Sequence, residues 1–359
     1  MGVAVIMAGG FGKRLWPESN INHPKQFLAI KNKESFIQAT YRRASQLVGA
    51  ENTYLILREE LKDKVLSHIP SLSPSQLITE PVGRDTAPCI GFSATWIKKK
   101  KGDVPIVVLP SDHLIEEEDK FNKVMSAAIK QAEKEYLVAI GIKPTRAETG
   151  YGYLQLGEKI GEISGTFFYK LKRFTEKPSQ KKAKEFFESG NFLWNAGIFV
   201  WRPSIILEEI KKYLPLLYEG LEKIQKFLDT PEEEKVKREI YPNLPKISID
   251  YAVMEKTDKA IAVPGDFFWD DIGDWQALER IFSKDKQGNI MKGLVKGIES
   301  VGSTFINREN KILGVIGLSN IIVINCDKGL LIVKKELSQK VKDLVNAILE
   351  DENLKKYLE

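Results

Sequence analysis

Short apolar runs alternate with amphipathic, Lys/Glu-rich stretches over most of this 359-residue chain. The runs are β-branched or aromatic and end at glycine or proline, as buried strands do; they lie at residues 3–7, 54–57, 106–109, 137–142, 170–174 and 198–201. The stretches between them have helical spacing of apolar residues, at residues 35–47, 86–100, 119–133 and 179–188. This alternation predicts an α/β fold, with a Rossmann-like, mostly parallel sheet flanked by helices. Ligands of such sheets bind outside the carboxyl ends of the strands.

The pattern changes after about Ser283. Short β-type runs punctuated by Gly and Asn follow, at residues 293–298, 312–316, 321–324 and 330–333, and an amphipathic helix is expected at 337–349. We therefore expect a catalytic domain over residues 1–284 and a small β-rich domain over residues 285–359 that ends in a helix. A β-helix-like form is compatible with these runs, although we find no clean internal repeat to support it.

Composition excludes several classes of protein. The 54 Lys+Arg nearly balance the 49 Asp+Glu, so the net charge of +5 excludes a histone-like nucleic-acid binder. Cys89 and Cys326 are far apart, which indicates neither a disulfide scaffold nor a zinc site. No run approaches 18 apolar residues. We expect a cytoplasmic protein with no membrane and no nucleic-acid partner.

The N-terminal run leads directly into three glycines and two cations, at Gly9, Gly10, Gly12, Lys13 and Arg14. Glycines let the backbone approach a ligand closely, and nearby cations neutralise phosphate charge. The spacing matches neither a Walker A loop nor a dinucleotide-binding fingerprint. A glycine-rich turn with surface cations is the alternative, but the pattern favours phosphate binding.

Two carboxylates of the chain are candidate magnesium ligands. Asp112 follows a buried run and Pro110, so it is expected at the carboxyl edge of the sheet, and Asp271 comes from a distant segment. Magnesium favours one or two carboxylates together with phosphate oxygens and water. The alternatives are a strand-end cap at Asp112 and an acidic turn at Asp270 and Asp271.

Seven segments of the chain, taken in order, resemble the sugar-1-phosphate nucleotidyltransferases, and among them the branch that uses mannose 1-phosphate. The segments are residues 9–15 with 24–26, then 80–88, 109–113, 148–153, 174–178, 194–197 and 248–255. The resemblance is dense over residues 1–281 and looser beyond them. It implies transfer of GMP from GTP to mannose 1-phosphate with Mg²⁺, giving GDP-mannose and pyrophosphate, in a homodimer.

The resemblance also assigns residues. The nucleotide-binding positions it implies are Ala8, Gly9, Gly10, Gly12, Lys13, Arg14, Glu80, Pro81, Gly83, Thr86 and Asp112. The substrate-binding positions are Gly150, Tyr151, Gly152, Glu176, Lys177, Asn195 and Asp271. The catalytic positions are Arg14, Lys25, Asp112 and Asp271, of which Asp112 and Asp271 would bind the metal.

The side-chain chemistry supports these assignments. A carboxylate beside an ammonium, as at Glu176 and Lys177, can bind a sugar hydroxyl and a phosphate, and Asn195 offers both a donor and an acceptor beside an aromatic residue. A surface ion pair and a turn-forming asparagine are the alternatives. Two positions depart from the family pattern, since Lys13 replaces a small hydroxyl residue and Asp85 replaces an asparagine.

Three rival functions remain open. Another hexose-1-phosphate nucleotidyltransferase, using glucose 1-phosphate or a different nucleotide, shares the glycine loop. A non-catalytic regulatory homologue that binds GDP-mannose is a second rival, and a Rossmann dehydrogenase is disfavoured by the glycine spacing. About 75 residues follow Ser283 and the chain has only 3 histidines, so we expect transferase activity without an added cupin-type isomerase domain.

Overall fold

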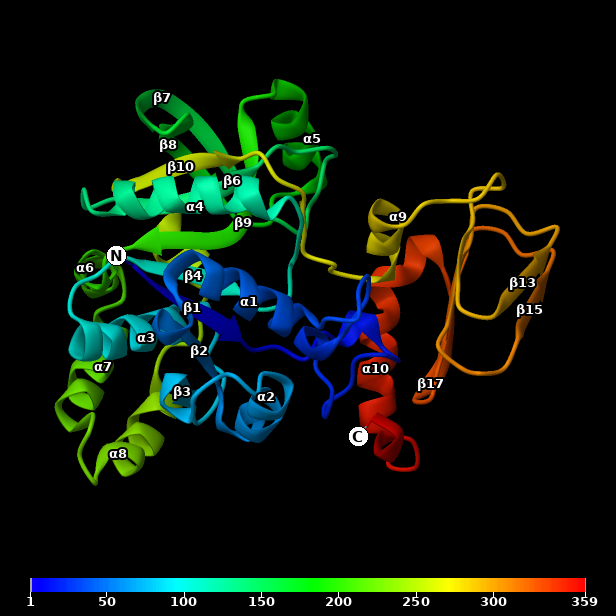
Figure 1. The fold of residues 1–359 in the computed structure, drawn as a ribbon, viewed down its shortest axis with the longest axis horizontal. Helices are drawn as coiled ribbons and strands as arrows, with labels where there is room; N and C mark the ends of the chain where they lie inside the picture. Colours follow the sequence, from blue (N-terminus) through cyan, green and yellow to red (C-terminus); the bar gives the residue numbers. More distant parts are fainter. Residues whose placement is uncertain (1, 359) are drawn as a thin grey trace. The chain divides into compact units, whose positions relative to one another are not determined.

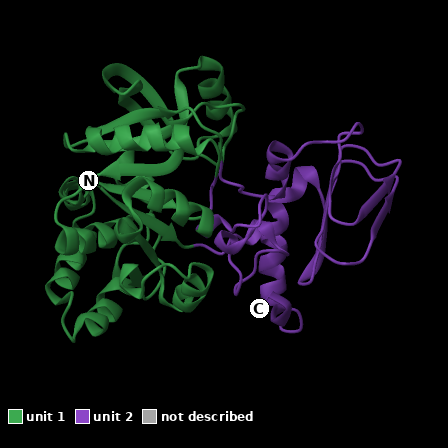
Figure 2. Ribbon diagram, in the orientation of Figure 1, with its two compact units in different colours: residues 1–9, 38–111, 115–269 green, residues 10–37, 112–114, 270–359 purple. Residues whose placement is uncertain are grey.

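The computed structural model describes residues 2–358, which fall into two compact units (Figures 1 and 2). Unit 1 contains the residues up to Gly9, residues 38–111 and residues 115–269. Unit 2 contains residues 10–37, residues 112–114 and the chain from residue 270 onward. The unit that contains the C-terminal segment therefore also contains most of the glycine loop.

A nine-stranded sheet with the order β3-β2-β1-β4-β9-β6-β10-β8-β7 forms the centre of unit 1. Its strands are β1 (Val3–Ala8), β2 (Thr53–Arg58), β3 (Leu77–Glu80), β4 (Ile106–Pro110), β6 (Leu137–Ile142), β7 (Tyr153–Ile163), β8 (Thr166–Thr175), β9 (Phe192–Trp201) and β10 (Ala260–Gly265). Only β8 and β9 of these strands run against the common direction. The predicted mostly parallel sheet is confirmed.

Helices cover this sheet because alternate residues of each strand point to opposite faces. On one face Val3, Val5 and Val108 belong to a buried core that α3 (Thr86–Lys101), α6 (Pro203–Tyr213) and α7 (Pro215–Phe227) complete. The remaining helices are α1 (Phe36–Val48), α2 (Lys62–His68), α4 (Glu118–Ala132), α5 (Gln180–Ser189) and α8 (Glu233–Ile240). Two short strands, β5 (Leu114–Ile115) and β11 (Trp269–Asp270), pair with each other.

The C-terminal part of unit 2 is a β-helix-like stack of short strands, as the sequence suggested. Its elements are α9 (Leu278–Ile281), β12 (Ile290–Lys292), β13 (Val295–Ile298), β14 (Thr304–Asn307), β15 (Leu313–Ile316), β16 (Ile321–Cys326), β17 (Gly329–Lys334) and α10 (Val341–Glu350). The pairs β13–β15 and β14–β16 are parallel, and Asn325 Nδ2 donates to Asn307 Oδ1 at 2.9 Å across a separation of 18 residues. The strands therefore repeat every 18 residues, although few side chain types recur at that interval.

Unit 2 also joins the segment after the glycine loop to the β-helix stack. Trp275 Nε1 donates to the carbonyl of Trp16 at 2.8 Å, and a Cβ on Gly329 would lie 3.2 Å from the Trp16 ring. Arg308 forms an ion pair with Glu18 at 2.8 Å. In the described part of the chain, no helix is both long enough and apolar enough to cross a membrane.

Candidate active site

The glycine loop begins where β1 ends and leaves space for a ligand at its first two glycines. A Cβ built on Gly9 or Gly10 would meet no described atom within 4 Å, and both residues are exposed. Gly12 is different, because its φ of 71° is a left-handed conformation and its Cβ would lie 2.4 Å from Lys25 Cβ. Glycine at position 12 therefore lets the loop pack directly on Lys25.

The two cations after the loop have different surroundings. Lys13 Nζ donates to Asn346 Oδ1 of α10 at 2.7 Å and lies 5.9 Å from the centre of the Phe11 ring. Arg14 is exposed, and the next residue, Leu15, is buried and anchors this short 3₁₀-helix. Sequence reasoning did not find Asn346, because nothing near it in the sequence indicates a partner for Lys13.

Lys25 links the two candidate metal ligands in unit 2. Its Nζ lies 2.8 Å from Asp112 Oδ2 and also donates to the backbone carbonyl of Asp271. Burial alone would raise the pKa of Asp112, but the charges of Lys25 and of the neighbouring His113 outweigh it and hold that pKa below its usual value. Asp112 is therefore ionised at neutral pH, and the structure brings the predicted site residues Lys25, Asp112 and Asp271 together.

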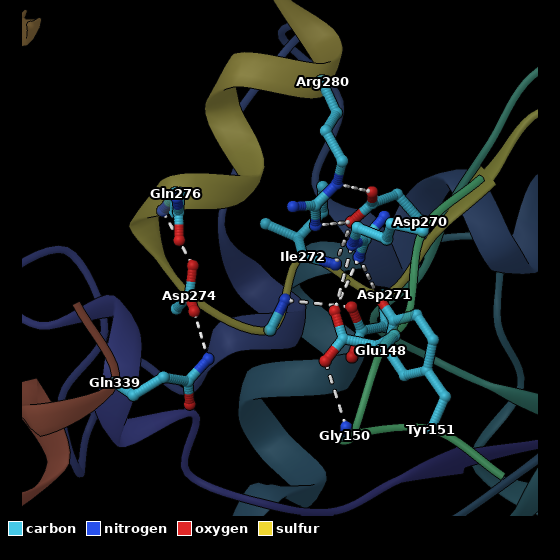
Figure 3. A network of polar contacts seen from close by, with 12 residues as sticks. Glu148, Gly150, Tyr151, Asp270, Asp271, Ile272, Asp274, Gln276, Arg280 and Gln339 are labelled. Carbon is cyan, nitrogen blue, oxygen red and sulfur yellow. Dashed lines mark hydrogen bonds and ion pairs between the residues drawn. The ribbon is translucent and has the colours of Figure 1, made fainter. Parts of the chain in front are cut away.

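The adjacent aspartates Asp270 and Asp271 make different contacts (Figure 3). Asp270 is buried, forms a two-pronged pair with Arg280, and accepts a hydrogen bond from Ile272 N at 2.8 Å. Asp271 is half-buried, and its Oδ1 accepts a longer bond from Gly273 N, at 3.2 Å. Ile272, the buried β-branched residue that follows this pair, has a φ of 45° and is therefore strained.

The donor chemistry of unit 2 fits a magnesium ion. Asp112 and Asp271 offer hard carboxylate oxygens, and the lowered pKa of Asp112 keeps it in the form that binds a cation. The described residues, 2–358, contain no group of three or more Asp, Glu, His or Cys side chains arranged to hold a metal. Mg²⁺ commonly binds through one or two carboxylates and takes its remaining ligands from phosphates and water.

A second cluster, in unit 1, contains the residues expected to bind the sugar phosphate. Lys177 Nζ lies 3.0 Å from Glu176 Oε1, and the Lys177 side chain is 58% exposed whereas that of Glu176 is only 9% exposed. A Cβ on Gly152 would lie 2.5 Å from Glu176 Oε2 and 3.2 Å from the Cβ of Asn195. Gly152 therefore acts here by leaving room for these two side chains.

Asp250 is a member of this cluster that sequence reasoning missed. Its Oδ1 accepts a hydrogen bond from Asn195 Nδ2 at 2.9 Å. Burial, and then the nearby Glu176 carboxyl, raise the pKa of Asp250, and burial also raises that of Glu176. Segment 248–255, one of the seven that carry the family resemblance, was the available signal, but nothing in it indicates that Asp250 contacts Asn195, 55 residues away.

Gly150 and Tyr151 lie on a loop that other side chains hold. Gly150 N donates to Glu148 Oε1 at 3.0 Å (Figure 3). Arg146 pairs with the same carboxylate at 2.9 Å. The Tyr151 ring is buried and packs edge-on against Trp194 and Trp269, with ring centres 5.2 Å apart in each case. The Tyr151 ring is thus part of the core, its hydroxyl accepts from Arg146 Nη2 at 3.4 Å, and its carbonyl accepts from Lys177 N at 3.2 Å.

The segment expected to bind the nucleotide base follows β3. Glu80 is buried and accepts a hydrogen bond from the Tyr241 hydroxyl; burial raises the pKa of Glu80 to about 7, against the opposing effect of that bond. Thr86 Oγ1 accepts from Ile249 N at 2.9 Å, and Asp85 caps α3 by accepting from Thr86 N.

The other nucleotide-binding positions of unit 1 offer mainly backbone. Gly83 is exposed, Pro81 is half-buried, and the Ala8 side chain is fully buried. The predicted nucleotide positions therefore divide between the units: Ala8, Gly9, Glu80, Pro81, Gly83 and Thr86 belong to unit 1, and Gly10, Gly12, Lys13, Arg14 and Asp112 belong to unit 2.

Comparisons with known proteins agree with this arrangement. A family model for nucleotidyl transferases matches residues 3–288, and one described as "MannoseP isomerase/GMP-like beta-helix domain" matches residues 295–348. The chain is 36% identical over 348 residues to the mannose-1-phosphate guanylyltransferase RfbM of Salmonella typhimurium, covering 95% of this chain and 71% of the relative. A mannose-1-phosphate guanylyltransferase of Klebsiella pneumoniae is 35% identical over 351 residues, covering 97% of this chain and 74% of the relative.

A solved structure extends the likeness to the fold of the whole chain. A Thermus thermophilus protein described as a mannose-1-phosphate geranyltransferase aligns with a TM-score of 0.86 and 34% identity, covering 98% of this chain and 99% of that one. The α/β sheet and the β-helix-like stack both fall within this alignment.

Proposed function

Because the chain belongs to the mannose-1-phosphate guanylyltransferase family of nucleotidyl transferases, we propose that it transfers GMP from GTP to mannose 1-phosphate. An oxygen of the sugar phosphate attacks the α-phosphorus of GTP. The new P–O bond forms as the bond from that phosphorus to the bridging oxygen breaks, and pyrophosphate leaves. The products are GDP-mannose and pyrophosphate.

The chemistry requires charge neutralisation more than proton transfer. A sugar phosphate is already an anionic nucleophile at neutral pH, so no strong base is needed. The barrier comes from bringing two polyanions together in line, which positioning and electrostatic stabilisation lower. The lysine that bridges Asp112 and Asp271 is the observation that carries the proposal, since it places a fixed cation beside two candidate magnesium ligands.

The glycine loop, whose first residue Gly9 belongs to unit 1, and residues of unit 2 act on the triphosphate and the metal in this proposal. Backbone N–H groups at the open positions Gly9 and Gly10 bind phosphate oxygens, as does Arg14. Asp112 and Asp271 would hold Mg²⁺, which when bound would supply positive charge to neutralise the phosphates. Lys25 fixes the orientation of the Asp112 carboxylate and adds positive charge.

The residues of unit 1 bind the sugar phosphate and the base. Lys177, exposed at its tip, pairs with the phosphate of mannose 1-phosphate, while Glu176 and Asn195 bind sugar hydroxyls. Gly150 offers exposed backbone to the same ligand. The buried Glu80 and the backbone of the segment after it bind the guanine base.

We further propose that residues 1–284 carry the chemistry and residues 285–359 support it. The family models that match residues 3–288 and 295–348 support this division. A homodimer is proposed on the exposed aliphatic side chains of the paired residues Ile298 and Ile316, which are 54% and 70% exposed. Light scattering of the purified chain measures the oligomeric state directly.

A pyrophosphate-release assay tests the proposed reaction. GTP, UTP, dTTP and CTP are each paired with mannose 1-phosphate and glucose 1-phosphate, with Mg²⁺ present. Release that is fastest with GTP and mannose 1-phosphate is expected. Fastest release with another pair identifies a different hexose-1-phosphate nucleotidyltransferase, and binding of GDP-mannose without release from any pair indicates a regulatory homologue.

A further inference from the structure

The segment that follows the buried residue Ile249 is a π-helix, which is rare in proteins and common at functional sites. It spans Asp250–Met254, and Glu255 N donates to the carbonyl of Asp250 at 3.0 Å, the five-residue closure of a π-turn. Ala252 and Val253 are buried, so the turn is held in the core of unit 1.

The two carboxylates at the ends of this turn both contact the sugar-phosphate cluster. Asp250 Oδ1 accepts from Asn195 Nδ2 at 2.9 Å, and Glu255 Oε1 accepts from the backbone N–H of Glu176 at 2.8 Å. In an α-helix, residues 250 and 255 would lie about 140° apart around the axis. The wider π-turn brings residues five apart onto nearly the same face, so a single turn can hold both partners.

The contact with Asp250 settles which way the Asn195 amide points. Asn195 Oδ1 accepts from Gly197 N at 3.1 Å while its Nδ2 donates to Asp250. Each end of the amide thus has one protein partner, and one N–H and one oxygen lone pair remain for a ligand. An amide fixed in this way presents a defined donor and a defined acceptor to a sugar hydroxyl.

The contact with Glu255 has a parallel consequence for the neighbouring residues. It fixes the backbone N–H of Glu176, and the next residue, Lys177, has a φ of 44° and donates its own N–H to the carbonyl of Tyr151 at 3.2 Å. The backbone that carries the Glu176–Lys177 pair is therefore held from two sides. Without Glu255 only one of these two tethers would remain.

We propose that the π-turn 250–254 is a positioning device for the sugar phosphate, in which Asp250 orients the Asn195 amide and Glu255 orients the backbone of Glu176 and Lys177. This inference rests on the proposed function, because it takes these residues to be the binding side for mannose 1-phosphate. Asp250 and Glu255 are positioning residues, since each acts through a neighbour.

Steady-state kinetics of four variants test the proposal. Asp250→Ala removes the acceptor for Asn195 and is expected to raise the KM for mannose 1-phosphate about tenfold, with the KM for GTP within twofold of wild type. Asp250→Asn retains an acceptor oxygen and is expected to recover most of that loss. Glu255→Ala is expected to raise the same KM about fivefold, and Glu255→Gln to raise it less.

A matched control and a double variant separate positioning from a structural effect. Asp266→Ala removes a carboxylate that is 96% exposed in the same unit, and is expected to leave both KM values unchanged. In an Asn195→Ala background, Asp250→Ala is expected to add less than a twofold further change, because its effect passes through the missing amide.

The outcomes distinguish this inference from the proposed function. If the wild-type enzyme releases no pyrophosphate from GTP and mannose 1-phosphate, the proposed function fails. If the wild type is active but Asp250→Ala leaves the KM for mannose 1-phosphate unchanged, only the positioning role fails. An equal rise in both KM values together with a lowered Tm, or a full additional effect in the Asn195→Ala background, also overturns it.

Discussion

Both units place a lysine beside a carboxylate, yet the two pairs have opposite electrostatics. In unit 2, the Lys25 side chain is only 10% exposed and lies between Asp112 and a backbone carbonyl, and the pKa of Asp112 is lowered. In unit 1, Lys177 is 58% exposed, and the pKa of Glu176 is raised by burial even though the two are in contact.

The difference lies in the surroundings of each pair. Burial and then the Glu255 carboxyl raise the pKa of Glu176, which in turn raises the pKa of the half-buried Asp250, whereas Asp112 has a buried lysine and a histidine as its main neighbours. A fixed, buried cation stabilises the carboxylate form more strongly than a lysine screened by water. Asp112 in unit 2 is thus kept as an anion that can bind a cation. Glu176 in unit 1 is protonated more readily, so it can donate or accept a hydrogen bond with a hydroxyl group.

The largest expected effect is in unit 2. Asp112→Asn removes the anion and is expected to lower kcat on the order of a hundredfold, because Mg²⁺ loses a ligand and transition-state charge is left uncompensated. The change in Tm is expected to be small. Kinetics at saturating Mg²⁺ with a thermal melt check it, and near-normal turnover contradicts the role of Asp112.

The adjacent pair Asp270 and Asp271 provides a matched control for this prediction. Asp271→Asn is expected to impair turnover as a ligand change does. Asp270→Asn breaks the buried pair with Arg280 and is expected to lower the free energy of unfolding by about 2 kcal/mol with less effect on kcat. Equal behaviour of the two variants would contradict their separate roles.

Two glycine substitutions distinguish packing of the loop from contact with a ligand. Gly12→Ala places a methyl group against Lys25 in a left-handed conformation, and is expected to cost about 2 kcal/mol of stability and to lower activity. Gly9→Ala meets open space and is expected to raise the KM for GTP several-fold without changing Tm. Melting curves measure the stability of both variants, and GTP titrations measure their KM. If Gly9→Ala has an unchanged KM for GTP, the loop does not bind the triphosphate at Gly9.

The buried acid Glu80 predicts a pH effect on stability in unit 1. Its folded-state pKa of about 7 exceeds the ordinary value of 4.5, so the folded protein binds the extra proton, and the free energy of unfolding falls as pH rises from about 4.5 to about 7. Glu80→Gln removes this loss. The variant is expected to gain up to about 3 kcal/mol relative to wild type at pH 8, compared with pH 4.

Parallel urea denaturation of wild type and Glu80→Gln at pH 4 and pH 8 measures this difference. Tyr241→Phe serves as a companion, because it removes the hydroxyl that donates to Glu80 and is expected to leave the raised pKa in place. A stability difference between wild type and Glu80→Gln that is independent of pH contradicts the buried, protonatable state of Glu80.

The smallest expected effect concerns the contact of Lys13 with the C-terminal helix. Asn346→Ala removes one hydrogen bond and is expected to cost about 1 kcal/mol of stability. The KM for GTP is expected to change less than threefold in either direction. GTP binding by Asn346→Ala and by Lys13→Ser is measured by calorimetry. If Lys13 binds the nucleotide, Lys13→Ser binds GTP more weakly and Asn346→Ala does not. If Lys13 only holds the C-terminal helix, the two variants bind GTP with the same affinity.

Sequence patterns were sufficient to predict the secondary-structure elements, because that information lies in neighbouring residues. The buried apolar run of β1 and the glycines after it predicted a strand followed by a phosphate loop, and the helix at 86–100 lies within α3, Thr86–Lys101. Asp112, close after a buried strand and a proline, contacts the same lysine as the Asp271 carbonyl. Each of these inferences depends on residues within a few positions of one another.

Features that depend on distant contacts could not be predicted. The partner of Lys13 is 333 residues away, the partner of Asn195 is 55 residues away, and the β-helix rungs repeat through pairs such as Asn307 and Asn325 with otherwise different neighbours. No periodicity within a short segment predicts such pairs, and segment 248–255 by itself therefore assigned no role to Asp250.

The sequence by itself determined the α/β class, the glycine loop, the acid and base residues available for chemistry, and the family. Only the tertiary structure decided which of those acids are charged and which residues hold them. The physical reason is that a pKa and a side-chain orientation depend on burial and on neighbouring charges, and in this chain both come from segments that the fold, and not the order of residues, brings together.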